Sequence, residues 1–131
     1  MLRWPRLFDT KTIEGLAVAV LAVGGWPPAR LVDALAPLRD AGVMAPTEVA
    51  GMDLGVLTVK LAKNGYDRGL LTSMYAERLQ AVFREIAAGH LEDLPALVAS
   101  GDEEEFARRL RAIHGIGPKV AKNAWLRLTS Q

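Results

Sequence analysis

The spacing of the apolar residues constrains the fold of this chain more than any other feature. From Ile13 to Leu128 they recur at intervals of three and four residues, which place them on one face of a helix. No segment sustains the two-residue alternation of a half-buried strand. We therefore expect an all-α fold, a compact bundle of about six helices.

The size and composition of the chain narrow the functional classes. It has 131 residues, of which 50% are hydrophobic, and we expect one domain spanning residues 1–131. It contains no cysteine, which excludes disulfides, thiolate metal sites and cysteine nucleophiles, and its two histidines are too few for a zinc site. We expect no metal and no cofactor, and a reducing cytoplasmic location.

The apolar run Leu16 to Val23 raises the question of a membrane. It has less than half of the ~20 residues needed to cross a bilayer, so it predicts a buried helix. Because Arg3 and Arg6 precede the run, a secretory signal is the competing interpretation, but charged residues interrupt that pattern. We expect no membrane association.

Glycine, proline and capping residues predict where the helices begin and end. Ser100 and Glu103 have the spacing of a capping box, which predicts the start of the helix that ends near Ile113. The other expected helices are residues 11–23 ending at Gly24-Gly25, a helix opened by Pro27-Pro28, a short helix opened by Pro46, a helix capped by Asp53 and closed by Asn64-Gly65, a long helix over 68–88, and a last helix opened by Pro118.

The charges are unevenly distributed along the chain. The net charge of +1 does not by itself indicate a nucleic-acid binder. However, six acidic and no basic residues lie between Glu92 and Glu105, and six basic and no acidic residues follow Phe106. A basic surface near the C-terminal end is one interpretation, and a helix pair with solvated charged faces is the other.

The stretch IHGIGPKVAKNAW predicts a tight turn between two helices. Gly115 and Gly117 permit positive φ, Ile116 can fill the space beneath the turn, and Pro118 suits a first helical residue. The N–H groups that open the second helix form a site for a phosphate, beside Lys119 and Lys122. A purely structural turn is the alternative.

The longer stretch LRAIHGIGPKVAKNAWL resembles the helix-hairpin-helix motif L-x-x-L-P-G-I-G-x-x-x-A. Its setting is similar to the helix-hairpin-helix base-excision DNA glycosylases typified by endonuclease III, since IEGLAVAVLAV resembles their buried first barrel helix and LAKNGYDRGLLTSMYAERLQAVFREI the segment leading into their long helix. The resemblance implies sequence-independent contacts to the backbone of double-stranded DNA by Gly115, Ile116, Gly117, Lys119, Val120 and Lys122.

Lys119 stands where lyase-type members of that family have a lysine that attacks the sugar C1′. The positive end of a helix and the nearby Lys122 favour the neutral, nucleophilic form of its amine. The family's catalytic aspartate lies beyond the hairpin, however, and this chain has no carboxylate side chain after Glu105. A carboxylate such as Asp9, Glu14 or Asp33, or a partner chain completing the cleft, would have to replace it.

The resemblance leaves three functions open. The leading one is sequence-independent DNA binding by a glycosylase-like protein of base-excision repair; the second is a minimal glycosylase or abasic-site lyase using Lys119; the third is a protein-interaction module. Whether the protein is an enzyme stays open at this stage.

Trp26 follows Gly24-Gly25, where the family often has a glutamine that fills the space left by a flipped base. An exposed tryptophan here would contact DNA as a wedge, and the alternative is a residue that covers the edge of the core. We interpret Trp4 and Trp125 as structural and His90 as a solvated loop residue.

Overall fold

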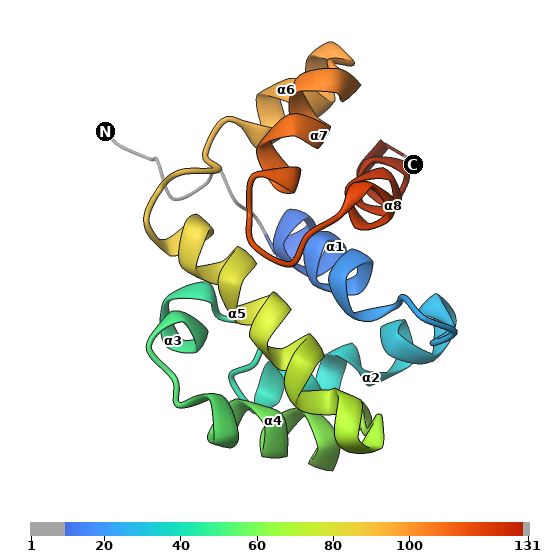
Figure 1. Ribbon diagram of the computed structural model, residues 1–131, viewed down its shortest axis with the longest axis vertical. Coiled ribbons are helices and arrows are strands. Elements are labelled where there is room, and N and C mark those ends of the chain that lie inside the picture. The colour runs from blue at the N-terminus through green and yellow to red at the C-terminus, as the bar shows by residue number, and fades with distance from the viewer. Residues whose placement is uncertain (1–9, 130–131) are drawn as a thin grey trace.

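The computed structural model describes residues 10–129, which form eight α-helices, one 3₁₀ turn and no strand (Figure 1). The all-α prediction is confirmed, and the described residues contain more helices than the six or so expected because short helices add to the count. The elements are α1 (Thr10–Leu21), α2 (Pro28–Asp40), α3 (Pro46–Ala50), α4 (Leu54–Lys63), η2 (Gly69–Leu71), α5 (Thr72–Ala87), α6 (Leu94–Ser100), α7 (Glu103–Arg111) and α8 (Pro118–Thr129).

Helix α1 lies at the centre of the molecule, between α5 and α8 (Figure 1). Every residue from Glu14 to Leu21 is buried, as the apolar run predicts. Gly15 packs so closely on α8 that a Cβ there would lie 2.6 Å from Leu128 Cδ2. Because Gly15 near the start of α1 faces Leu128 near the end of α8, the two helices run antiparallel. The first turn of α8 therefore lies toward the C-terminal end of α1.

Helix α1 ends at Leu21, two residues earlier than predicted, where side chains bind the carbonyls of Leu21 and of the loop that follows. The Tyr66 hydroxyl donates to the Leu21 carbonyl at 2.5 Å. The Arg68 guanidinium donates to the carbonyls of Val23 at 2.6 Å and Gly24 at 2.7 Å. Gly24 and Gly25 then take positive φ angles of 65° and 91°, which turn the chain away from the helix.

Most of the predicted helix ends are confirmed. Pro28 is the first residue of α2, and Asp53 caps α4 by accepting from the Val56 N–H at 3.2 Å. Asn64 ends α4, followed by Gly65 with a φ of 107°. The long helix starts at Thr72 instead of residue 68, because residues 69–71 form the 3₁₀ turn η2.

The predicted capping box of Ser100 and Glu103 is wrong. Ser100 is the last residue of α6, a helix that the sequence patterns did not reveal, and its hydroxyl donates to the Leu97 carbonyl at 3.3 Å. Gly101 ends α6 with a φ of 78°. Asp102 caps α7 instead, since its carboxylate accepts from the Glu105 N–H at 3.2 Å.

The remaining helices form two groups on either side of α1. Helices α3 and α4 pack on α5, whereas α6 and α7 pack together and against α8. Tyr66, Phe83 and Phe106 are fully buried. Among the described residues, no helix combines the length and apolar character needed to span a membrane. Trp4 and Asp9 lie outside the described residues.

Candidate nucleic-acid interface

Helices α7 and α8 are joined by a tight turn. Its Ile116 N–H donates to the Ile113 carbonyl at 3.0 Å, and Gly115 has a φ of 86°, as predicted for at least one of the two glycines. Gly115 is exposed, whereas the Ile116 side chain is buried beneath the turn. The turn thus presents its backbone outward and anchors itself by one apolar side chain.

The first turn of α8 has the features of an anion site. The Ala121 N–H donates to the Gly117 carbonyl at 3.1 Å, so the N–H groups of Lys119 and Val120 precede the first intrahelical bond. The first turn contains no acidic residue, and the Lys119 side chain is exposed. Val120 is buried on the side facing the core, so only its backbone can contact a ligand.

Lys122 differs from Lys119 in having a partner. Its ammonium donates to Glu103 Oε2 of α7 at 2.7 Å. Because both side chains are about half exposed, this ion pair contributes roughly 0–1 kcal/mol to stability. Lys122 is therefore a weaker candidate for a phosphate contact than the sequence indicated, since a carboxylate already neutralises it.

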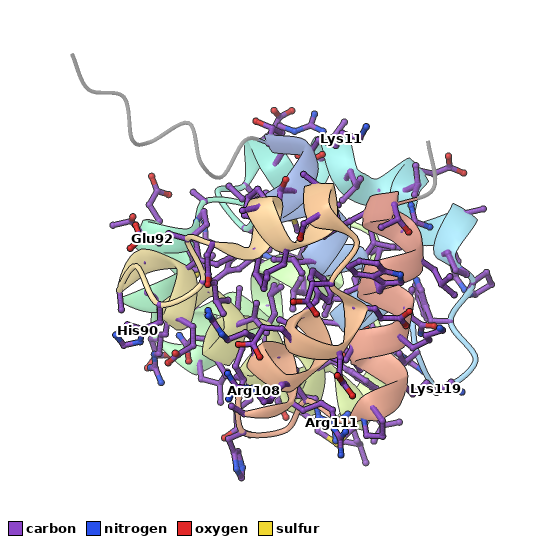
Figure 2. All side chains as sticks on the ribbon, turned by 90° about the horizontal axis from the view of Figure 1, so that it is seen from above. Lys11, His90, Glu92, Arg108, Arg111 and Lys119 are labelled. Carbon is purple, nitrogen blue, oxygen red and sulfur yellow. The ribbon has the colours of Figure 1, made fainter. Side chains whose placement is uncertain are left out.

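Folding also neutralises other basic residues of the C-terminal segment. Arg108 Nε and Arg109 Nε each donate to Glu105 at 2.8 Å, and Arg109 also binds Asp93. The hydrogen bonds from the two arginines lower the pKa of Glu105 to about 2. Figure 2 shows Arg108 and Arg111 on α7 and Lys119 at the start of α8. Among the described residues, Arg111 and Lys119 have no carboxylate partner.

Trp26 is not the exposed wedge considered from the sequence. Its side chain is buried, and its ring lies 5.0 Å from the Tyr66 ring in an edge-on arrangement. The Arg30 guanidinium covers it at 4.0 Å from the ring centroid. Within the described part of the chain, the buried Trp26 Nε1 finds no hydrogen-bond acceptor. Trp26 therefore covers the core edge, which was the alternative.

Trp125 and His90 have the surroundings expected of a structural and a solvated residue. Trp125 packs edge-on against Phe106, with ring centroids 5.2 Å apart. His90 is exposed in the turn after α5, where its Nδ1 lies 3.0 Å from Glu85 Oε1.

Three arginines that contact aromatic rings, Arg30, Arg68 and Arg78, were not predicted from the sequence, and Arg78 lies beside the turn. The Arg68 carbon Cζ lies 4.3 Å from the Tyr75 ring centroid, and Arg78 Cζ lies 5.4 Å from the same centroid. The stem of Arg78 crosses Gly115, since a Cβ on that glycine would lie 3.2 Å from Arg78 Cγ. We name Arg30, Trp26, Arg68, Tyr75 and Arg78 the arginine–aromatic row. The sequence shows the i, i+3 spacing of Tyr75 and Arg78 and the i, i+4 spacing of Trp26 and Arg30, but not the contacts of Arg68 with both rings.

Of the carboxylates considered as partners of Lys119, neither Glu14 nor Asp33 forms an ion pair with it. Glu14 binds Arg39 at 2.6 Å and shares a shallow hollow with Arg127 and Leu128, at the opposite end of α8 from Lys119. Asp33 is exposed on α2. Within the described ranges, no group of three or more potential metal ligands occurs.

Several surface hollows lie on the described part of the molecule, and Ile113 and His114, just before the turn, line one of them. One lies between α1 and α8 and another along the outer face of α7, with a third between α5 and α7. Lys119 lines none of these. Lys119 is exposed and is not enclosed by these hollows, which suits contact with a large partner better than enclosure of a small molecule.

Comparison of the chain with protein-family models, with curated proteins and with solved structures finds no significant match in any of the three.

Proposed function

We propose that the protein binds double-stranded DNA without reading its sequence, through the turn between α7 and α8, as a glycosylase-like protein of base-excision repair. One observation carries this proposal: an exposed turn with a left-handed Gly115 opens α8 beside an exposed Lys119 that has no carboxylate partner within residues 10–129. The sequence resemblance to the helix-hairpin-helix motif supports the same function.

The chemistry of the turn fits a phosphate group. Pro118 has no N–H, so the donors near the helix start are the backbone N–H groups of Gly117, Lys119 and Val120. The positive end of the helix dipole and the Lys119 ammonium attract an anion to the same place. A Cβ on Gly117 would meet nothing within 4 Å, so a phosphate can approach the backbone closely. Such contacts position the DNA and carry no sequence information.

Titration of fluorescent duplexes at several salt concentrations tests the proposal. Plain, mismatched and abasic duplexes are compared for the wild-type protein and for Lys119→Ala. We expect the substitution to weaken binding by a similar factor on all three and to reduce the salt slope by about 1. Lys122→Ala is expected to have a smaller effect because Glu103 already pairs with Lys122.

Arg127→Ala is the matched control, because Arg127 lies on the same helix about 12 Å along the axis from Lys119. Arg127→Ala also removes one positive charge, and it should leave the salt slope of DNA binding unchanged. If Lys119→Ala bound DNA with unchanged affinity, the DNA-binding surface would have to lie elsewhere on the protein. Failure of the wild-type protein to bind any duplex at low salt would overturn the proposal and favour a protein-interaction module.

The exposure of Lys119 also favours a second function, a slow lyase activity on abasic DNA. Its neutral amine would attack the open-chain C1′ aldehyde and lose water to form a Schiff base. Base excision also requires stabilisation of a positively charged transition state, and loss of the carboxylate that provides it costs on the order of 10²-fold in rate. We expect borohydride to trap wild-type protein and Lys122→Ala on abasic DNA but not Lys119→Ala. Efficient excision of a damaged base by the purified chain would contradict this assignment.

A further inference from the structure

The arginine–aromatic row connects three parts of the fold that are far apart in sequence. Arg30 belongs to α2, Arg68 to the segment before η2, and Arg78 to α5. The Arg30 and Arg68 guanidinium carbons lie 4.0 and 5.4 Å from the Trp26 ring centroid. Those of Arg68 and Arg78 lie 4.3 and 5.4 Å from the Tyr75 ring centroid. Cations and rings thus alternate along one continuous row.

The middle of the row is attached to the main chain. Arg68 donates to the carbonyls of Val23 and Gly24, so its donors stabilise the end of α1. A Cβ on Gly24 would lie 2.7 Å from the Tyr75 hydroxyl, so the loop and the row are in close contact. Arg68 is therefore a structural residue that holds a positive charge beside the loop after α1.

The two outer arginines are held differently. Arg30 is exposed and Arg78 is half-buried, and within residues 10–129 neither pairs with a carboxylate. Contact with an aromatic ring face restricts a guanidinium without using its N–H groups. Arg30 and Arg78 therefore combine a restricted position with donors available to an anion. Other arginines of the chain, such as Arg39 and Arg108, already bind carboxylates.

The row ends at the turn that carries the proposed phosphate site. The stem of Arg78 lies over Gly115, and the antiparallel packing of α1 and α8 brings the Gly24 end of α1 toward the first turn of α8. Arginine side chains thus follow one another from Gly115 across α5 to α2. A surface of this kind suits a partner with regularly spaced anions, which is the chemistry of a nucleic-acid backbone.

We propose that Arg30 and Arg78 bind backbone phosphates and extend the DNA contact of the α7–α8 turn across α5 to α2. This inference rests on the proposed function, because its partner is the same duplex. Each arginine contributes one phosphate contact and reads no base. Arg68 supports the surface from within and is not itself proposed as a contact.

Glutamine substitutions test the two contacts with little disturbance of packing. Arg30→Gln and Arg78→Gln keep part of the apolar stem and remove the charge, which matters for Arg78 because its stem packs on Gly115. We expect each to lower the salt slope by about 0.9, and the double variant by about 1.8, on plain and abasic duplexes alike. The control is Arg84→Gln, also on α5, whose exposed guanidinium donates to the Ala50 carbonyl on the side of α3.

If the wild type binds DNA while both glutamine variants keep its salt slope, the extended contact is overturned and the turn remains the interface. If the wild type does not bind DNA, the proposed function itself fails. Thermal unfolding of each variant confirms that the fold is retained.

Discussion

At the scale of single residues, Gly115 carries the geometry of the turn. Its positive φ costs a residue with a side chain about 1–2 kcal/mol, and a Cβ would also crowd Arg78 Cγ. We predict that Gly115→Ala lowers the free energy of unfolding by at least this amount. Gly117 has no positive φ and an open surrounding, so Gly117→Ala should cost less than about 1 kcal/mol. Urea unfolding of both variants measures the difference, and equal losses would contradict the prediction.

The sequence predicted the turn but could not distinguish its residues. Both glycines allow positive φ, and the contact with Arg78 that makes Gly115 special joins residues 37 positions apart. Likewise, the partner of Lys122 is Glu103 on another helix. From the sequence, Trp26 could be an exposed wedge or a residue that covers the core edge. Only its packing with Tyr66 and Arg30 distinguishes the two.

At the scale of the helices, the cap of α7 is the feature most open to test. Asp102 accepts from the Glu105 N–H, whereas the Ser100 hydroxyl contacts only its own helix α6. We predict that Asp102→Ala lowers the free energy of unfolding by about 1 kcal/mol and that Ser100→Ala changes it by less than about 0.5 kcal/mol. Urea unfolding at neutral pH measures both. If Ser100→Ala lost more unfolding free energy than Asp102→Ala, the capping box of Ser100 and Glu103 would be favoured after all.

Helix ends marked by proline, glycine or aspartate were predictable because these residues act locally, on the backbone within a few residues of themselves. Pro28, Asp53 and Gly65 are examples. Helix α6 was not predicted, although Pro95 lies in its first turn and Gly101 follows it, because its seven residues are too few to show a clear period and Ser100 was assigned to a capping box instead. The end of α1 also depends on distant groups, the side chains of Tyr66 and Arg68.

At the scale of the whole molecule, stability should depend on pH through Tyr66. Burial raises the pKa of its phenol from 10.0 to about 12, although Arg68 opposes that rise. Between these values the phenol ionises in the unfolded chain but stays protonated in the folded protein. Ionisation of the phenol therefore stabilises the unfolded state relative to the folded one. We predict that the free energy of unfolding falls as the pH rises from 10 to 12.

Tyr66→Phe separates this effect from the titration of other groups. Below pH 10 it should be about 1 kcal/mol less stable than the wild type, because it lacks the hydrogen bond to the Leu21 carbonyl. Since phenylalanine does not ionise, the gap should narrow between pH 10 and 12. Urea unfolding of both proteins across this range measures the gap, and a constant gap would count against the raised pKa.

The packing of α1 on α8 has a consequence during synthesis. Because α8 begins about a hundred residues after α1 ends, translation at about 5–20 residues per second completes it roughly 5–20 s later. Throughout that interval the apolar surface of α1 that α8 later covers is exposed at the ribosome. The nascent chain therefore offers chaperones a binding segment in α1, the helix whose residues Glu14 to Leu21 are all buried in the finished protein.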